Sequence, residues 1–290
     1  MVSVPGQEAF TVPTPEGRMA VELRGPRPAG PTVVCLHGLT ANRTTWRPVA
    51  DRLRHRSLLL VDLLGRGESE ASREARYDLD SEARRLAHVL QTLGLTRPVL
   101  AGHSQGAAIA VAAAGRVKAR GLLLVNPVTP DLSRPAALSA LRHPPVRSLV
   151  APALRLFRRS LTRYMLVRRV FADGASIPAG AVDRYAAPWG DPERATCLPR
   201  ILSDWDPAEL ERWAAPPEVP VRVLSGAEDR RIDPDLARRW AARLGGTFSL
   251  SAGCGHSAPE ERTTEVATVL EDLVAAICAW EQEETQDDQE

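Results

Sequence analysis

The stretch that decides the fold is Val99-Leu100-Ala101-Gly102-His103-Ser104-Gln105-Gly106-Ala107-Ala108-Ile109-Ala110. A short apolar run leads into Gly-x-Ser-x-Gly, and an Ala-rich segment follows with no helix breaker before Gly115. This pattern predicts a strand, a sharp turn with Ser104 at its apex, and a helix. Glycine is required on both sides because a Cβ at Gly102 or Gly106 would collide with neighbouring backbone in so tight a turn. The turn is expected to expose the Ser104 hydroxyl at a helix N-terminus, where free N–H groups and the helix dipole favour negative charge.

Gly-x-Ser-x-Gly alone is a weak indication of a nucleophile, because three fixed positions recur by chance about 0.1 times in a chain of this length.

The chain has 290 residues, 44% of them hydrophobic, which suits one large domain or a domain with an insertion. A net charge of +1 predicts no general attraction to nucleic acid or anionic lipid. Lys118 is the only lysine, so nearly all the positive charge is arginine. We interpret this as a coding bias of the source genome, which lowers the functional weight of any single arginine.

The N-terminal segment 1–8 has neither the basic start nor the apolar run of a signal peptide. No segment reaches the uncharged length of about 18 residues that a membrane span requires. We therefore expect a cytoplasmic protein without a membrane span.

The cysteines Cys35, Cys197, Cys254 and Cys278 are far apart and lack metal-type spacing. They are expected to be buried thiols rather than a disulfide framework, and no metal site is expected.

Continuous apolar runs recur along the chain and alternate with segments of helical periodicity. The predicted strands are 32–36, 57–61, the run from Val99, 121–125, 219–224 and 247–250, after an N-terminal hairpin of 9–12 and 19–23. The predicted helices are 45–53, 80–93 with Asp80 or Ser81 as its cap, the Ala-rich segment, 234–244 and 257–280. Strands without alternation that are separated by helices are typical of the α/β class, a mostly parallel sheet with helices on both faces. Ligands bind beyond the C-terminal ends of such strands, where Ser104 lies.

The alternation of predicted strands and helices is interrupted between Asn126 and Pro217. Prolines 144–145, 152, 188 and 199 are expected to separate short helical pieces there. We predict a core domain of residues 1–126 and 218–282, a helical lid inserted at 127–217, and an acidic tail at 283–290.

A serine hydroxyl is a poor nucleophile at neutral pH, so Ser104 needs a base and the base needs a partner that fixes its tautomer. His37 and His103 lie in tight glycine turns, and His55, His88 and His143 lie on or beside predicted helices. His256 instead follows the last predicted strand, in a loop at the same edge as Ser104. We therefore predict His256 as the base, the alternative being a loop histidine without a partner.

The acid that orients the base should also follow a strand. Asp229 lies just past the strand that ends at Leu224 and is our choice, with Glu228 and Asp233 as competitors. Asn126, after another strand, lacks the negative charge that the role requires. The resulting order is Ser, acid, His, as in α/β hydrolases. The backbone N–H groups of Gln105 and Leu39 are the predicted donors to a tetrahedral oxyanion, so their side chains are free to vary.

These motifs together resemble the α/β-hydrolase superfamily in its lid-bearing, esterase-like branch. The resemblance rests on Leu36-His37-Gly38-Leu39, Asp62-x-x-Gly65-x-Gly67-x-Ser69, Gly102-x-Ser104-x-Gly106, Gly226-x-x-Asp229 and Gly255-His256, over residues 31–125 and 219–280. It implies a Ser-His-Asp hydrolase without a cofactor, in which the segment 62–69 is a structural turn. Branches that open epoxides or remove halogen use aspartate at the position of Ser104. Branches that cleave carbon–carbon bonds often have asparagine at the position of His103.

Between Ser133 and Val170 the predicted lid has arginines and no carboxylate. The arginines are Arg134, Arg142, Arg147, Arg155, Arg158, Arg159, Arg163, Arg168 and Arg169. An apolar stripe at helical spacing consists of Val150, Leu154, Phe157, Leu161 and Met165. We interpret the arginine-rich side as a solvated face, with an anionic substrate or an acidic carrier protein as the alternative, and the stripe as packing against the core rather than a membrane anchor.

The sequence therefore predicts a serine hydrolase that cleaves a carboxylic ester or lactone of a small, mostly apolar molecule through an acyl-enzyme on Ser104. One alternative keeps the same residues in a thioesterase, acyltransferase, cyclase or carbon–carbon hydrolase of a biosynthetic pathway. Another alternative is a non-catalytic binding protein on the same fold.

Overall fold

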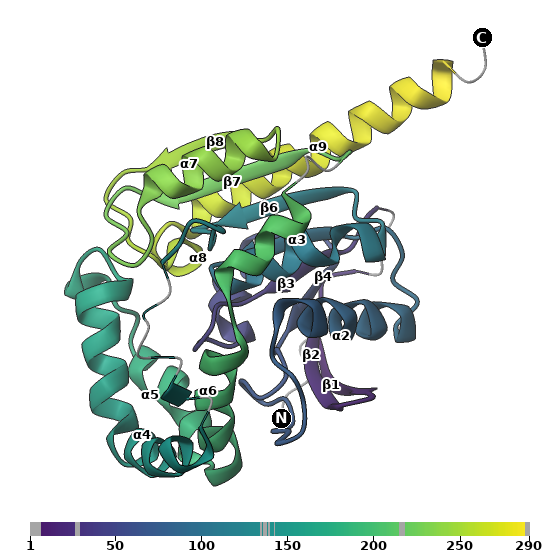
Figure 1. Cartoon of the computed structure of the whole chain (residues 1–290). Helices are drawn as coiled ribbons and strands as arrows, with labels where there is room; N and C mark the ends of the chain where they lie inside the picture. The colour runs from purple at the N-terminus through teal and green to yellow at the C-terminus, as the bar shows by residue number, and fades with distance from the viewer. Residues whose placement is uncertain are drawn as a thin grey trace.

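The computed structural model describes residues 7–26, 30–133, 135, 138, 140–141, 143–214 and 218–287 (Figure 1). The strands are β1 (Gln7–Thr14), β2 (Gly17–Arg24), β3 (Val33–Leu36), β4 (Leu58–Val61), β5 (Val99–His103), β6 (Gly121–Val125), β7 (Val221–Gly226) and β8 (Thr247–Ser251). The α-helices are α1 (Arg47–Arg52), α2 (Leu79–Thr92), α3 (Gln105–Val117), α4 (Pro144–Met165), α5 (Ala181–Ala186), α6 (Pro192–Asp204), α7 (Pro234–Arg243), α8 (Ala258–Glu261) and α9 (Thr263–Asp287). Shorter turns of other helix types are η1 (Arg43–Trp46), η3 (Leu166–Val170), η4 (Gly174–Ser176), η5 (Ala187–Gly190) and η6 (Pro207–Trp213).

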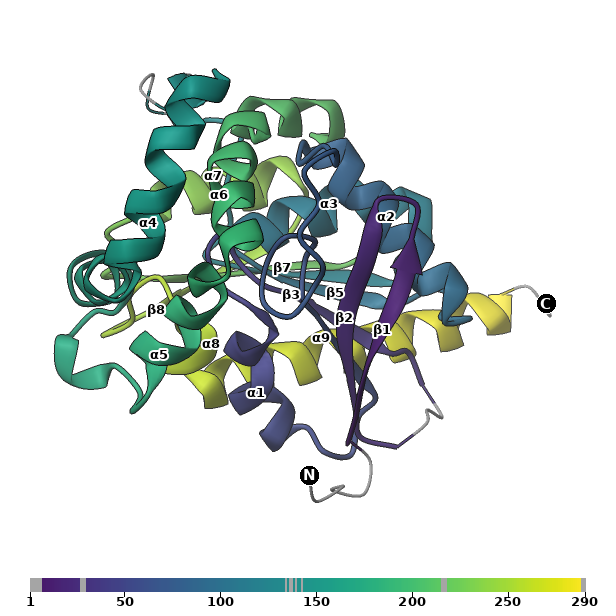
Figure 2. The same cartoon turned by 90° about the horizontal axis from the view of Figure 1, so that it is seen from below.

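The strands form one eight-stranded sheet in the order β1-β2-β4-β3-β5-β6-β7-β8. The hairpin of β1 and β2 lies at one edge and is antiparallel to its neighbour β4, whereas the pairs from β4 to β8 are parallel. Figure 2 shows α2, α3 and α7 on one face of the sheet and α1 and α9 on the other. The predicted α/β fold, with its mostly parallel sheet and edge hairpin, is confirmed.

The central strands are apolar throughout because both of their faces are covered. Successive side chains of a strand point to opposite faces. In β3, Val34 and Leu36 join the apolar cluster beneath α2, α3 and α7, whereas Val33 and Cys35 join the cluster beneath α1 and α9. Both hydrophobic cores therefore draw on the same short strands, which explains why these strands lack polar alternation.

The predicted strand, turn and helix around Ser104 are also present. β5 ends at His103 and α3 begins at Gln105, and Ser104 between them has a φ of 56°. A Cβ at Gly102 would overlap the backbone of Gly106 and Ala107, and a Cβ at Gly106 would overlap the backbone of Leu36. The crowding expected of this turn is thus the reason for both glycines.

The segment between β6 and β7 contains α4, α5 and α6 and no strand among its described residues. We call it the helical insertion, and it lies beyond one end of the sheet strands (Figure 1). Prolines were expected to break its helices, and this is wrong for Pro152 and Pro199, which lie inside α4 and α6. Pro144 begins α4, as suits a residue without an N–H group. An interior proline costs about 3 kcal/mol, and α4 and α6 pack against each other, which offsets this cost.

The apolar stripe predicted on α4 is only partly internal. Leu154, Leu161 and Met165 line a cavity between the insertion and the sheet. Phe157 is 60% exposed, so its predicted packing against the core is wrong. The reason is that α4 is covered on one side only, and Phe157 lies on the outer side with other exposed residues such as Leu156. Of the predicted arginines, Arg134 and Arg142 lie outside the described residues.

Several helix boundaries differ from the prediction. α2 begins at Leu79, because the Asp78 side chain accepts a hydrogen bond from Ser81 N and is therefore the cap, instead of Asp80 or Ser81. The closing helix is divided into α8 and α9 around Arg262. α9 then continues to Asp287, so most of the predicted tail 283–290 is helical, in keeping with the high helix propensity of its Glu and Gln residues. Residues 288–290 lie outside the described part of the chain.

Within the described ranges, no helix has both the length and the apolar composition that crossing a bilayer would need. The four cysteines are free thiols, and Cys35, Cys197 and Cys254 are buried. This agrees with the predicted buried thiols, except that Cys278 is only partly buried.

Candidate active site

Ser104, Asp229 and His256 meet at one edge of the sheet. They follow β5, β7 and β8, whose C-terminal ends point the same way because the strands from β5 to β8 are parallel. The His256 Nε2 atom is 3.0 Å from Ser104 Oγ, and His256 Nδ1 is 2.8 Å from Asp229 Oδ2. The three side chains thus form one chain of hydrogen bonds across residues that are up to 152 positions apart.

Asp229 is held by four hydrogen bonds. Its Oδ2 accepts from His256 and, at 2.9 Å, from the Asn126 side-chain amide. Its Oδ1 accepts from the backbone N–H groups of Arg231 at 2.8 Å and Ile232 at 3.1 Å. Burial acts to raise the pKa of this carboxyl, but the His256 imidazole and the two N–H donors hold the pKa below its ordinary value. Asp229 is therefore an anion that fixes a proton on His256 Nδ1 and leaves the Nε2 lone pair facing Ser104.

The carboxylates of the two alternative acids, Glu228 and Asp233, make other hydrogen bonds. The Glu228 carboxylate accepts a hydrogen bond from Cys254 N at 2.8 Å. The Asp233 carboxylate accepts from Asp235 N at 2.9 Å and caps α7. Neither of these carboxylates is hydrogen-bonded to His256, whereas the Asp229 carboxylate is.

His256 is also fixed through its backbone. Its N–H donates to Val170 O of the insertion at 2.6 Å, and its carbonyl accepts from His103 Nε2–H at 2.7 Å. Burial, and then the neighbouring His256, lower the pKa of His103 to about 3, so His103 is neutral at physiological pH. A neutral His103 donates one hydrogen bond to the His256 carbonyl and so helps to hold the backbone of His256 in place.

The predicted oxyanion donors, Gln105 and Leu39, both lie near Ser104. Gln105 is the first residue of α3, and the first N–H groups of a helix have no partner within the helix. Leu39 follows Gly38, and a Cβ at Gly38 would lie 3.1 Å from Ser104 Cβ, so this turn packs directly against the serine. Both residues are close to Ser104, Leu39 in the cavity lining and Gln105 as its chain neighbour.

Arg66 contacts both Gln105 and Leu39 through its side chain. Its side chain is fully buried and is paired with Glu82. Its Nη2 donates to Gln105 Oε1 at 2.9 Å, and its Nε lies 3.5 Å from Leu39 O. Arg66 belongs to the segment 62–69, where a Cβ at Gly67 would overlap the Asp62 carboxylate. This segment is a tight turn that braces the loop after β3, as the resemblance implied.

Sequence reasoning missed Asn126 and Arg66 as neighbours of the site. Asn126 was considered only as an acid, whereas it is a donor to Asp229. Its one sign in the sequence was its position directly after a predicted strand, and the structure shows it at a positive φ of 45°. Arg66 had no usable signal, because arginines are abundant throughout the chain.

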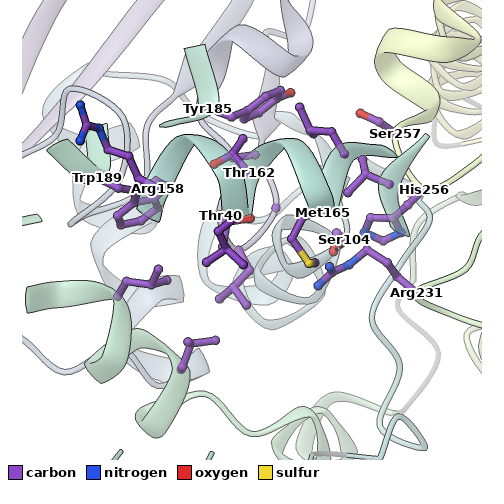
Figure 3. A pocket seen from close by; sticks show the side chains of 18 of the residues that line it. Thr40, Ser104, Arg158, Thr162, Met165, Tyr185, Trp189, Arg231, His256 and Ser257 are labelled. Atoms are coloured by element: carbon purple, nitrogen blue, oxygen red, sulfur yellow. Dashed lines mark hydrogen bonds between the residues drawn. The ribbon is translucent and has the colours of Figure 1, made fainter. Parts of the chain in front are cut away.

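A cavity of about 280 Å³ opens at Ser104 (Figure 3). Its lining is mostly apolar and comes from the sheet edge and from the insertion, whose Leu154, Met165 and Trp189 face it. Ser104 is only 8% exposed, so the expected exposed hydroxyl instead lies largely buried in the wall of this cavity. Such a site suits a small, largely apolar molecule that carries a group for Ser104 to attack.

Comparisons with known proteins agree with this fold. A family model described as the alpha/beta hydrolase family matches residues 33–269. The chain is 25% identical over 256 residues to the uncharacterized hydrolase YugF of Bacillus subtilis, covering 85% of this chain and 91% of that protein. It is 28% identical over 266 residues to the lipase LipV of Mycobacterium tuberculosis, covering 87% and 97%. An alpha/beta hydrolase fold protein from Burkholderia ambifaria superposes with a TM-score of 0.77 at 24% identity, covering 93% of this chain and 98% of that chain.

Proposed function

Because the chain belongs to the alpha/beta hydrolase family, we propose that it is a serine hydrolase that cleaves a carboxylic ester or lactone of a small, mostly apolar molecule. The observation that carries the proposal is the chain of hydrogen bonds from Asp229 through His256 to Ser104, which ends in an apolar cavity. The lipase name of the Mycobacterium tuberculosis relative supports an ester as the bond that is cleaved.

In this mechanism His256 Nε2 takes the proton of the Ser104 hydroxyl while Oγ attacks the ester carbonyl. The resulting oxyanion accepts hydrogen bonds from the N–H groups of Gln105 and Leu39. The imidazolium, stabilised by Asp229, then protonates the leaving alcohol and the acyl-enzyme remains on Ser104. Water loses a proton to His256 and attacks the acyl carbon, and the acid product leaves with regeneration of the serine. The helical insertion acts as a lid that limits water and shapes the acyl pocket.

The test is the reaction with p-nitrophenyl butyrate. We expect a burst of p-nitrophenol stoichiometric with the enzyme, and a serine ester on the Ser104 peptide in mass spectra of acid-quenched enzyme. Ser104→Ala is expected to lower kcat on the order of 10⁶-fold, because a hydroxyl nucleophile is lost.

Ser148→Ala is the matched control. Ser148 is an exposed serine on α4, and its substitution should leave the rate unchanged. An unchanged rate in Ser104→Ala, or an acyl group on another residue, would refute the proposal. Partitioning of the acyl group to added alcohols or thiols would reveal transfer in place of hydrolysis.

A further inference from the structure

The loop between β7 and α7 places an arginine in the wall of the cavity. Arg231 lies two residues after Asp229, and its backbone N–H is one of the donors to the Asp229 carboxylate. Its side chain extends into the cavity toward Ser104 and Met165 (Figure 3). The same carboxylate that orients His256 therefore fixes the point from which the Arg231 side chain starts.

The Arg231 guanidinium has no carboxylate partner at ion-pair distance in the described part of the chain. Asp229 is the nearest candidate, but each of its oxygens already accepts two hydrogen bonds, which is about the full capacity of a carboxylate. Asp229 therefore attracts Arg231 only at longer range. The guanidinium donors of Arg231 remain available to a molecule in the cavity.

The rest of the cavity wall has the same sign of charge. Two arginines, Arg158 and Arg231, line the cavity, and none of its lining residues is an aspartate or a glutamate. Arg158 lies at the other end, near Trp189, and its guanidinium donates to Arg155 O at 2.9 Å (Figure 3). Burial lowers the pKa of Arg231, and the charge of Arg169 on η3 lowers it further, whereas the charge of Asp229 acts to raise it. Arg231 also keeps part of its surface exposed to solvent, so its guanidinium is accessible to an anion that enters the cavity.

We infer that Arg231 binds a carboxylate carried by the substrate, so that the preferred substrates are anionic esters such as the half-esters of dicarboxylic acids. This inference rests on the proposed function and deepens it by assigning the charge of the substrate. A guanidinium matches a carboxylate through two parallel hydrogen bonds. The apolar remainder of the cavity would hold the hydrocarbon part of the same molecule.

The first test measures binding without catalysis. Monomethyl adipate and neutral methyl hexanoate are titrated by calorimetry into the Ser104→Ala protein and into Ser104→Ala/Arg231→Gln. We expect the second substitution to weaken binding of monomethyl adipate about 10- to 100-fold and to leave binding of methyl hexanoate unchanged. Equal affinity of both proteins for monomethyl adipate would overturn the inference.

Arg230→Gln is the matched control, because it removes the same charge one residue away. The Arg230 side chain is exposed and donates to Ala172 O at 3.2 Å. Ser104→Ala/Arg230→Gln should bind monomethyl adipate as the Ser104→Ala protein does. A loss of affinity as large as that of the Arg231 variant would mean that only the net charge matters, and would also contradict a specific site at Arg231.

The second test uses hydrolysis, with p-nitrophenyl hydrogen adipate and p-nitrophenyl hexanoate as a pair of equal chain length. Arg231→Gln should lower kcat/KM for the adipate about 10- to 100-fold relative to kcat/KM for the hexanoate, mainly through KM. Hydrolysis of both esters with equal sensitivity to Arg231→Gln would refute the inference and leave the proposed function intact. Absence of Ser104-dependent hydrolysis would refute the proposed function, and the titrations would still decide the role of Arg231.

Discussion

The Asp229 carboxylate accepts hydrogen bonds from several donors. The side chains of His256 and Asn126 and two backbone N–H groups come from three separate segments of the chain. An anion that is satisfied in this way has little freedom to turn. The position and tautomer of the His256 imidazole therefore depend on the negative charge of this residue.

Asp229→Asn should lower kcat about 10⁴-fold, because an amide in this place favours the wrong tautomer of the base while it keeps the geometry. The measurement is the steady-state rate with p-nitrophenyl butyrate. Asp233→Asn is the control for a carboxylate in the same loop and should retain the rate, since Asp233 caps α7. A variant at Asp229 as active as the wild type would exclude it as the orienting acid.

At the scale of elements, α3 approaches the backbone after β3 closely at a glycine in its first turn. Gly106 lies in its first turn, where the backbone of Leu36 and His37 leaves no room for a Cβ. Gly115 lies near its other end, with no atom within 4 Å of a built Cβ. The same helix therefore contains a glycine that the packing requires and a glycine that it does not.

Gly106→Ala should lower the free energy of unfolding by about 1–3 kcal/mol or more through overpacking, and should also reduce activity because the turn at Ser104 is displaced. Gly115→Ala should raise the free energy of unfolding by roughly 0.5–1 kcal/mol, because alanine loses less backbone entropy in a helix. Urea unfolding of both variants checks the pair. Equal effects of the two substitutions would contradict the close approach of α3 to β3.

At the scale of the whole molecule, the insertion and the core are joined around the His256 loop. Tyr185 of α5 donates to Glu260 at 2.5 Å and contacts Thr45 Oγ1 at 2.9 Å, while Val170 accepts from His256 N. The insertion therefore packs on the loop that carries the predicted base.

Two buried histidines make the stability of the molecule depend on pH. Burial lowers the pKa of His37 and of His103 to about 3, against 6.5 for an exposed imidazole. Between these values the unfolded chain binds a proton on each ring and the folded chain does not. The free energy of unfolding should therefore fall as the pH falls from 6.5 toward 3, by about 1.4 kcal/mol per pH unit for each histidine.

His103→Gln should reduce this slope by about 1.4 kcal/mol per pH unit, because one of the two protonation sites is removed. The slope is obtained from urea unfolding at several values between pH 6.5 and 4.5. His143→Gln replaces an exposed histidine and should keep the wild-type slope. An identical slope in His103→Gln would show that this ring does not remain neutral in the folded chain.

The sequence by itself determined the α/β class, the order of strands and helices in the core, and the turn at Ser104. These depend on local physics, namely apolar periodicity, glycine at crowded turns and the spacing of strand ends. The same reasoning selected Ser104, Asp229, His256, Leu39 and Gln105, whose catalytic roles stay predictions until the variants are measured.

The tertiary structure decided what local patterns do not contain. Pro152 and Pro199 remain within helices because α4 and α6 pack on each other, and Phe157 points outward because α4 is covered on one side. The contact of Asn126 with Asp229 joins residues 103 positions apart, which depends on the paths of two loops. Arg66 is buried beside Gln105, whereas Arg231 lines the cavity, although both are arginines in an arginine-rich sequence. Only the folded structure distinguishes Arg66 from Arg231, because the surroundings of each side chain are formed by segments that are distant in the sequence.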